Sequence, residues 1–339
     1  MRPGVYKILV TGGAGFIGSN FIRYILHEYP QYKIINLDKL TYAGNLDNLR
    51  DIDINQNYKF IKGDICDSKI LNKIMKDCNI IVNFAAETHV DRSIISCNKF
   101  LRTNVDGLNQ LLKVALKHNL KRFIHISTDE VYGSILEGRF KENDRLNPSN
   151  PYAASKAAGD LLALSYYKTN KLPVLITRSS NNFGPYQYPE KIIPLFITNA
   201  LKNKPLPLYG DGLNVRDWIF VEDNCQAIDL VMHNGKIGEI YNIGAGCEKI
   251  NKELTKIILS LMTKPEGLIK YVKDRPGHDR RYALNCEKIQ KLRWKPKYNF
   301  KDALELTIHW YLKNKNWWQE IKNKKQYKLH YKNWYSKRH

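Results

Sequence analysis

The sequence lacks the features of membrane-spanning and secreted proteins. Among its 339 residues, no apolar run approaches the roughly 18 residues that a transmembrane helix needs. The first apolar patch is soon broken by Gly12 and Gly13, so it is too short for a signal peptide. The six cysteines are scattered and form no C-x-x-C pair, which argues against a disulfide framework or a cysteine zinc site. We therefore expect a reduced, cytoplasmic protein without a bound metal.

Acidic residues are scarce relative to basic ones. The chain has 33 Asp and Glu against 54 Lys and Arg, a formal net charge of +21. Such an excess is found in nucleic-acid-binding proteins and in enzymes that attract anionic substrates. Because the basic residues are spread along the chain, we interpret most of them as a solvated surface, and we do not expect nucleic acid as a partner.

The stretch 322–339, "KNKKQYKLHYKNWYSKRH", contains no acid and interleaves Tyr and Trp with Lys. Basic residues with aromatic side chains between them can form a stacking platform for single-stranded nucleic acid. A basic tail on the protein surface is the simpler interpretation, and it is the one we favour.

The first half of the chain alternates short β-rich runs with helical patterns, and no internal repeat is present. Strands are predicted at 6–13, 32–38, 59–65, 80–87, 122–128 and 173–181, and helices at 15–29, 68–77 and 104–119. Parallel pairing follows, because parallel strands need crossover connections. The runs are apolar throughout, as expected for strands covered on both faces. The fold class is therefore α/β, a Rossmann-type doubly wound parallel sheet.

The second half is more mixed and contains Pro and Gly at "FGPYQYPE", "NKPLPLYGDG" and "KDRPGHD". We expect three parts: a Rossmann domain over residues 1–180, a smaller mixed α/β domain over 181–321, and the basic tail 322–339.

The stretch "TGGAGFIGS" follows the first predicted strand and opens the first predicted helix. Gly13, Gly15 and Gly18 fit G-x-G-x-x-G, and Gly12, Gly15 and Gly18 fit G-x-x-G-x-x-G. Glycines in this context permit a tight turn and let a pyrophosphate approach the helix N-terminus. Asp38 ends the next strand, where a carboxylate accepts both ribose hydroxyls and repels a 2′-phosphate. The pattern favours NAD over NADP, and the alternative is a glycine-rich turn in another kind of α/β protein.

The stretch "YAASK" places Tyr152 and Lys156 four residues apart, on one face of a helix that Asn150 and Pro151 are suited to begin. A phenol has a reference pKa of about 10, and a nearby ammonium group lowers the pKa by stabilising the phenolate. Tyr152 is therefore a candidate general base. By itself such a pair is more often part of a solvated helix face.

Two adjacent acids, Asp129 and Glu130, follow the predicted strand 122–128 in "HISTDEVYG". One acid at a strand end can cap a turn. Two acids directly after a Thr indicate proton transfer, if a substrate lies above them.

Together these motifs resemble the extended short-chain dehydrogenase/reductase family. Within it, "STDEVYG", "AAETHVDRSI", "RSSNNFGPYQYPEKIIP", "LYGDGLNVRDWIFVEDN" and "DRPGHDRRYALN" are similar to the nucleotide-sugar 4,6-dehydratases. The resemblance extends from about Tyr6 to about Ile321. It implies NAD as cofactor, dTDP-glucose or UDP-glucose as substrate, and a 4-keto-6-deoxy sugar as product, a step towards deoxysugars such as rhamnose.

The resemblance also implies a role for each member of the catalytic group. Tyr152, beside Lys156, would take the C4 hydroxyl proton while hydride passes to NAD+, and Thr128 would hydrogen-bond the same oxygen. The C4 ketone makes the C5 proton removable, and Glu130 would take it. Protonated Asp129 would give a proton to the departing C6 hydroxyl, so the two acids need opposite protonation states.

Further positions are implied by the matching motifs. Residues expected to line the cofactor site are Gly12, Gly15, Phe16, Ile17, Gly18, Asp38, Asp64, Ile65, Ala85, Ala86, Glu87, Thr103, Tyr152, Lys156 and Asn182. Residues expected to bind the substrate are Thr88, Thr128, Asn181, Lys191, Ile192, Pro207, Tyr209, Arg216, Arg275 and His278, with Tyr282 in the same motif as His278. Arginine suits a diphosphate because its planar fork matches phosphate oxygens.

Several alternatives follow from the same comparison. In "YNIGAGCEK", Cys247 replaces an Asn that contacts the nucleotide in related enzymes, which leaves the choice between dTDP and UDP open. An epimerase or decarboxylase of the same fold is the nearest rival activity, and a non-catalytic NAD-sensing or nucleic-acid-binding regulator is a more distant one.

The family implies a homodimer, for which the apolar helices at 104–119 and 152–168 are the expected interface. The motifs end before residue 322, so removal of 322–339 is predicted to leave the chemistry intact.

Overall fold

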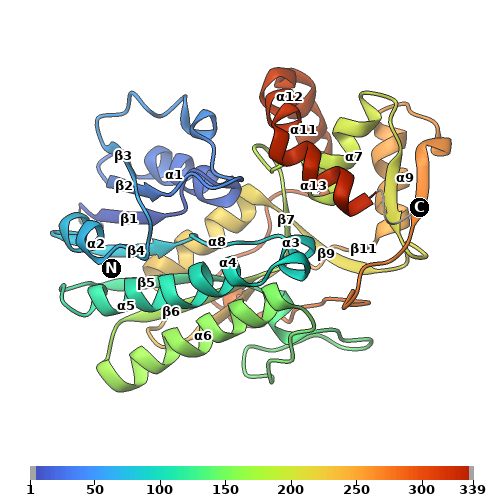
Figure 1. The fold of residues 1–339 in the computed structure, drawn as a ribbon. Helices are drawn as coiled ribbons and strands as arrows, with labels where there is room; N and C mark the ends of the chain where they lie inside the picture. The colour runs from blue at the N-terminus through green and yellow to red at the C-terminus, as the bar shows by residue number, and fades with distance from the viewer. Residues whose placement is uncertain (1–4, 336–339) are drawn as a thin grey trace.

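The computed structural model describes residues 5–335, and its largest element is a seven-stranded parallel sheet (Figure 1). The strands lie in the order β10-β6-β5-β4-β1-β2-β3, which is a doubly wound arrangement. Their bounds are β1 Lys7–Thr11, β2 Lys33–Asp38, β3 Tyr58–Lys62, β4 Ile80–Asn83, β5 Arg122–Thr128, β6 Val174–Ser179 and β10 Ile240–Ile243. The predicted α/β fold class is confirmed.

Helices cover both faces of this sheet because successive strand residues point to opposite sides. On β1, Ile8 and Val10 belong to one core cluster and Leu9 to another. The first cluster is covered by α1 (Phe16–Glu28) and α8 (Val221–Asn234). The second is covered by α2 (Ser68–Met75), α5 (Leu108–Ala115) and α6 (Pro151–Asn170).

A smaller part of the molecule contains two short sheets and the remaining long helices. One sheet has the order β11-β9-β7 and the other pairs β12 with β8. The strands are β7 Asn181–Phe183, β8 Leu206–Tyr209, β9 Val215–Phe220, β11 Glu248–Ile250 and β12 Ile269–Val272. The helices are α7 Ile192–Ala200, α9 Asn251–Leu261, α11 Phe300–Lys313, α12 Lys315–Asn323 and α13 Lys325–Tyr335. Figure 1 shows α11, α12 and α13, in red, at the end of the molecule that also carries α7 and α9.

Short helices connect these elements. They are α3 Val90–Ile95, α4 Asn98–Leu101 and α10 Glu287–Gln290, the 3-10 helices η1 Leu46–Leu49, η3 Asp129–Tyr132 and η4 Glu266–Leu268, and the π-helix η2 Arg102–Gly107. Among residues 5–335, no helix combines the length and apolarity required to cross a membrane.

Three expectations from the sequence need correction. The boundary at residue 180 does not separate two self-contained domains, because β10 returns from the second half to pair with β6. The helix expected over 104–119 begins as the π-helix η2 before continuing as α5. The basic stretch 322–339, expected as a tail on the surface, contains the helix α13 over Lys325–Tyr335, which buries Tyr327 and Trp334.

Candidate active site

The predicted site residues meet in two adjoining cavities beyond the carboxyl ends of the main-sheet strands. The larger cavity has a volume of about 310 Å³, and the smaller one of about 120 Å³. Of the predicted residues, the larger is lined by Gly12, Gly15, Phe16, Ile17, Gly18, Asp38, Asp64, Ile65, Ala85, Ala86, Glu87, Thr88, Thr103, Thr128, Asp129, Glu130, Tyr152, Lys156, Asn181, Asn182, Lys191 and Ile192. The smaller is lined by Glu130, Asn181, Lys191, Ile192, Pro207, Tyr209, Arg216, Arg275, His278 and Tyr282. The four residues Glu130, Asn181, Lys191 and Ile192 line both cavities.

The glycine-rich turn between β1 and α1 leaves no room for side chains at several positions, of which Gly12 and Gly18 are examples. Gly12 has a φ of 73°, and a Cβ there would lie 2.6 Å from the backbone nitrogen of Ala85. A Cβ on Gly18 would lie 2.5 Å from the carbonyl oxygen of Gly12. Gly15 immediately precedes α1, so the turn presents a helix N-terminus to the larger cavity. This cradle suits a pyrophosphate.

Asp38 lies at the end of β2 and lines the larger cavity. Its carboxylate accepts hydrogen bonds from the backbone N–H groups of Ala14 at 2.9 Å and Leu40 at 2.7 Å. Burial raises the pKa of Asp38, and these two hydrogen bonds oppose that shift. Each carboxylate oxygen can accept a second hydrogen bond, so the carboxylate can still receive ribose hydroxyls.

The strand β5 ends at Thr128, whose side chain caps the 3-10 helix that holds the two acids. Thr128 Oγ1 accepts from the backbone N–H of Glu130 at 3.3 Å and donates to Asp129 Oδ1 at 3.1 Å. Asp129 is 3 % exposed, and its pKa is raised well above the usual value, chiefly by burial and then by the nearby Glu130. Such an environment favours the protonated form of a carboxyl group, which can act as an acid.

The helix α6 begins as predicted, with Asn150 Oδ1 accepting from the backbone N–H of Ala153 at 2.9 Å and Pro151 in the first turn. Tyr152 and Lys156 are both buried and line the larger cavity. Lys156 Nζ donates to the carbonyl oxygen of Ile126 at 2.6 Å, and burial lowers the Lys156 pKa to about 8.

The environment of Tyr152 differs from the expectation of an easily formed phenolate. Burial raises the Tyr152 pKa, and the nearby carboxylate of Glu130 raises it further. Both effects disfavour negative charge on the phenol oxygen. A base at this position needs additional positive charge beside it before it can take a proton at neutral pH.

Several buried oxygens of residues that line the larger cavity have no hydrogen-bond partner among the described residues. Three of them lie on residues proposed for the sugar and the acid pair: Asp129 Oδ2, Glu130 Oε2 and Asn181 Oδ1. Buried polar atoms are normally paired, and an unpaired one indicates a place for a ligand group. The three oxygens can act as acceptors for several hydroxyl groups, as a sugar would supply.

The smaller cavity is lined by two arginines, together with Lys191 and the acidic residues Asp91, Glu130 and Glu190. Arg216 lies over the Tyr282 ring, with its guanidinium carbon 4.1 Å from the ring centroid, and its Nη2 donates to the carbonyl oxygen of Asp279 at 2.9 Å. Arg275 Nη1 lies 3.2 Å from Asp91 Oδ1. Two restrained guanidinium groups on one cavity suit a diphosphate.

His278 lies beside these arginines. Its Nδ1 is 2.6 Å from Asp274 Oδ1. Burial, with the charges of Arg275 and Arg216, lowers the His278 pKa to about 3, so the imidazole is neutral near neutral pH.

Both cavities are also lined by residues that were not predicted as site residues, among them Asp91, Trp218, Asn251 and Tyr335. Asp91 lies within the quoted motif "AAETHVDRSI" and Trp218 within "LYGDGLNVRDWIFVEDN", which could have indicated both. No pattern distinguishes Asn251, and Tyr335 lies in the stretch that was interpreted as a surface tail. That interpretation is wrong for Tyr335, because α13 packs beside the smaller cavity.

Cys247, which was expected to replace a nucleotide contact, is not among the residues that line either cavity. Its backbone N–H donates to Asp217 Oδ1 at 2.7 Å, and its carbonyl oxygen accepts from the backbone N–H of Trp218.

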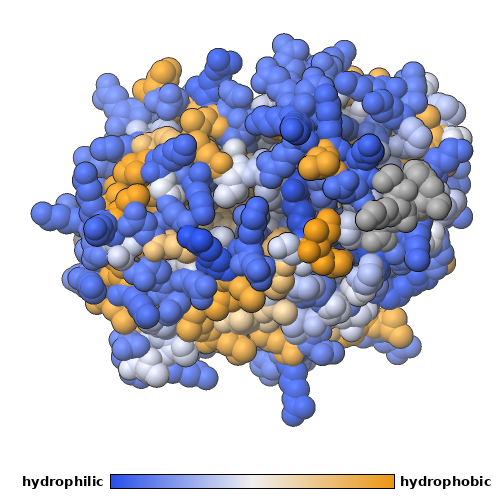
Figure 2. All heavy atoms as spheres, in the orientation of Figure 1, coloured by the Kyte–Doolittle hydropathy of each residue, from blue (hydrophilic) through white to orange (hydrophobic). Residues whose placement is uncertain are grey.

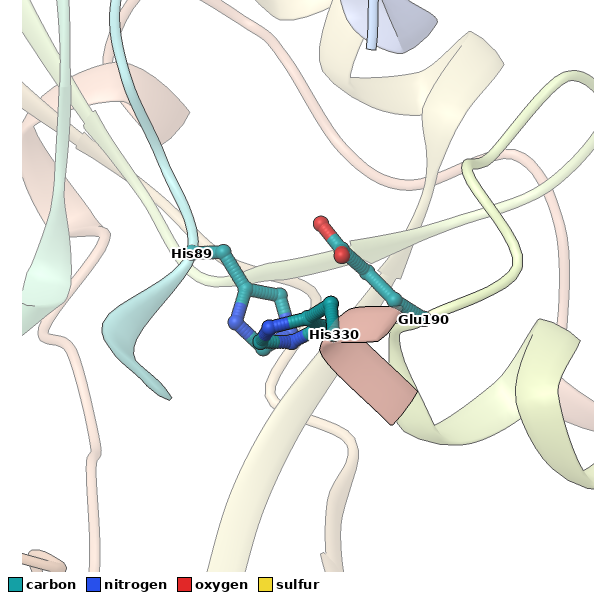
Figure 3. Close-up of side chains that lie close together, drawn as sticks. All are labelled: His89, Glu190 and His330. Carbon is teal, nitrogen blue, oxygen red and sulfur yellow. The ribbon is translucent and has the colours of Figure 1, made fainter. Parts of the chain in front are cut away.

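His89, Glu190 and His330 form a cluster whose potential metal-ligand atoms lie within 4.8 Å of one another (Figure 3). The three residues are far apart in the sequence, so no spacing pattern predicts the cluster. Glu190 Oε2 already accepts from Arg92 Nη2 at 2.8 Å and Nε at 3.0 Å, and the buried ammonium of Lys191 lies next in the chain. These cations disfavour a metal ion at the cluster.

Comparison with known proteins places these features in a family. The sequence model of the GDP-mannose 4,6 dehydratase family matches residues 9–307. A dTDP-glucose 4,6-dehydratase from Streptomyces niveus is 50% identical over 322 residues, which are 94% of this chain and 96% of that protein. The low-salt glycan biosynthesis protein Agl12 of Haloferax volcanii is 52% identical over 305 residues, 90% of this chain and 98% of that protein.

A solved structure is similar over nearly the same length. The dTDP-glucose 4,6-dehydratase DesIV from Streptomyces venezuelae, crystallised with NAD bound, superimposes with a TM-score of 0.92 at 48% identity. The match covers 93% of this chain and 99% of that structure.

Proposed function

The chain belongs to the GDP-mannose 4,6 dehydratase family, and we propose that it catalyses the NAD-dependent dehydration of a nucleotide-diphosphate glucose to the 4-keto-6-deoxy sugar. The observation that carries this proposal is the meeting of Thr128, Asp129, Glu130, Tyr152 and Lys156 in one cavity. Simple oxidation or epimerisation at C4 needs no adjacent pair of acids, whereas elimination of water needs an acid and a base.

The larger cavity fits NAD at two places. The turn formed by Gly12 to Gly18 is shaped for the pyrophosphate, and Asp38 is placed for the adenosine ribose. When bound, NAD+ supplies a reversible hydride acceptor and a positive charge on its nicotinamide ring. That charge offsets the burial that raises the Tyr152 pKa.

Oxidation at C4 uses Tyr152 as the base that takes the hydroxyl proton. Thr128, at the end of β5, hydrogen-bonds the same oxygen and orients it. The Lys156 ammonium is fixed by the carbonyl oxygen of Ile126, and its charge stabilises the Tyr152 phenolate. The resulting ketone acidifies the hydrogen on C5.

Elimination then uses the two acids in opposite protonation states. Glu130 removes the C5 proton, and Asp129 protonates the C6 hydroxyl as the C–O bond breaks and water departs. Because its pKa is raised, Asp129 favours the protonated form and can donate the proton that this step requires. Glu130 then returns a proton to C5. A bound NAD would give its hydride back at C6, so no net change of the cofactor is expected.

The diphosphate of the substrate binds in the smaller cavity to Arg216 and Arg275, with His278 beside them. Pro207, Leu208 and Phe196 provide an apolar wall suited to the nucleobase of the substrate. We propose dTDP-glucose as the substrate and UDP-glucose as the alternative. Cys247, whose presence left the choice between dTDP and UDP open, does not line the smaller cavity. Related proteins are named as dTDP-glucose 4,6-dehydratases.

The test is separate incubation with dTDP-glucose and UDP-glucose, followed by mass analysis. A product lighter than the substrate by one water, without net formation of NADH, supports the proposal. An unchanged mass with an inverted C4 would indicate the epimerase alternative, and NADH in proportion to product would indicate a plain dehydrogenase. A decarboxylase would instead need a nucleotide-sugar acid and release carbon dioxide from it.

We include a homodimer in the proposal, with α5 and α6 at its interface. Exposed apolar side chains lie on or beside these helices: Leu101 is 47 % exposed, Leu116 39 % and Leu161 61 %. Figure 2 shows apolar residues, in orange, among the polar surface over this region. Sedimentation of wild type and of Leu161→Glu would test the interface.

All six cysteines are free, which agrees with a reducing, cytoplasmic location.

A further inference from the structure

The C-terminal helix α13 is docked against the substrate-binding part of the molecule. Tyr327 is 4 % exposed, and its hydroxyl donates to the carbonyl oxygen of Pro189 at 2.7 Å. Just before α13, Lys322 Nζ donates to Thr198 Oγ1 and Asn199 Oδ1, both at 2.8 Å. These contacts fix the helix to α7 and to the loop that leads into it.

A second contact lies midway along α13. The His330 ring packs edge-on against the His89 ring with 5.6 Å between centroids, and Glu190 lies beside them (Figure 3). Burial lowers the pKa of both histidines, so both rings are neutral at neutral pH. The helix is therefore held next to His89 and Glu190, two residues of the smaller cavity's wall.

The last turn of α13 contacts Tyr209, a predicted substrate residue. Trp334 Nε1 donates to Tyr209 Oη at 2.5 Å, and the hydroxyls of Tyr335 and Tyr209 lie 3.3 Å apart. Tyr209 Oη donates to Asp91 Oδ2 at 2.8 Å, and the other oxygen of Asp91 pairs with Arg275. A chain of contacts thus joins the C-terminal helix to one of the two diphosphate arginines.

Tyr335 also lines the smaller cavity directly. It shares this wall with Pro207, Leu208 and Phe196, while Arg216 and Arg275 line the same cavity. An aromatic ring beside an apolar wall suits the base of a nucleotide, and guanidinium groups suit its phosphates.

The charge of this segment agrees with an anionic ligand. Between residues 322 and 335 there are five lysines and no acidic residue. A cationic segment beside a cavity raises the local concentration of an anionic ligand and speeds its capture.

We propose that α13 is part of the nucleotide-binding site. Tyr335 contacts the nucleoside end of the substrate, and Trp334 is a positioning residue that acts through Tyr209, Asp91 and Arg275. The inference rests on the proposed function and extends it, because the matched family model ends at residue 307, before α13 begins.

The experiment measures binding of dTDP to the full-length, NAD-loaded enzyme by calorimetry, together with kcat and KM for dTDP-glucose. Tyr335→Ala removes the ring, and we expect the Kd for dTDP and the KM to rise about tenfold or more. Tyr335→Phe removes one hydroxyl group, and Trp334→Phe removes the indole N–H together with part of the ring; we expect rises of about threefold in both. In all three variants kcat stays within about twofold and NAD affinity is unchanged.

The matched control is Tyr331→Phe, one turn earlier on the same helix and outside the cavity lining, which should bind dTDP like wild type. If Tyr335→Ala does not fold, as judged by circular dichroism, the two Phe variants decide the matter. Unchanged Kd and KM in the Tyr335 and Trp334 variants overturn the inference about α13 and leave the proposed function standing. Failure of wild type to bind either dTDP or UDP overturns it together with the proposed function.

Discussion

Lys156 Nζ lies 2.6 Å from the carbonyl oxygen of Ile126, and this hydrogen bond joins the N-terminal part of α6 to β5. Thr128 lies two residues after Ile126 on β5, and Tyr152 lies one turn before Lys156 on α6. The position of the ammonium therefore fixes the relative position of the base and the strand end that carries the acids. Several consequences of this arrangement can be measured.

Tyr152→Phe removes the proposed C4 base while keeping the ring packed. We expect hydride transfer to slow by about a hundred- to ten-thousandfold, because a positioned general base is worth that much. The cofactor should stay oxidised, as followed by NADH absorbance in a single turnover. Lys156→Met should cause a similar loss. A Tyr152→Phe enzyme that still forms NADH at the wild-type rate would remove Tyr152 from the chemistry.

Asp129→Asn and Glu130→Gln should separate elimination from oxidation. Neither acid is needed for hydride transfer, so both variants should still form NADH in a single turnover. Glu130→Gln should stop exchange of the C5 hydrogen with deuterated solvent, and Asp129→Asn should allow exchange but slow loss of water by about a hundredfold or more.

The control for both variants is Glu137→Gln, an exposed acid close by in the chain, which should behave like wild type. Solvent exchange at C5 that is as fast in Glu130→Gln as in wild type would show that the acid pair is structural.

The buried Asp129 carboxyl also predicts how stability depends on pH. Its pKa is raised in the folded protein, so between the unfolded value and the folded one the native state binds more protons than the unfolded state. Its contribution to stability is thus full below the unfolded pKa and is lost as the pH rises through the folded pKa. Asp129→Asn removes this loss, and its Tm should exceed that of wild type by about 2 °C or more at alkaline pH. The difference should shrink towards acidic pH in calorimetric scans, and a constant difference would contradict the assignment.

Asp38 predicts the choice of cofactor. Its carboxylate is held by the backbone of Ala14 and Leu40 and is placed for the ribose hydroxyls. Asp38→Ala should weaken NAD+ binding by about tenfold or more and reduce the preference for NAD+ over NADP+. Exposed Asp53→Ala is the matched control, and both affinities can be measured by fluorescence titration. Equal NAD+ affinity in Asp38→Ala and wild type would place the ribose elsewhere.

The sequence by itself determined the parallel sheet and indicated many of the residues that line the two cavities. Strands buried on both faces are apolar throughout, and parallel strands deliver their carboxyl ends to one edge, so local runs and motifs were enough to place Gly12, Asp38 and Thr128 together. The Tyr152–Lys156 pair was visible because four residues on a helix share a face.

Only the tertiary structure decided the parts that depend on contacts between distant segments. The return of β10 to the main sheet is a pairing of residues more than sixty positions apart, for which no local pattern exists. The pKa directions of Asp129 and Tyr152 follow from burial, which composition does not reveal. A basic stretch with Tyr and Trp has the composition of a solvated tail. Tyr335 reaches the smaller cavity because the aromatic face of α13 buries apolar surface against α7 and its preceding loop. This stabilisation exists only once those segments are folded.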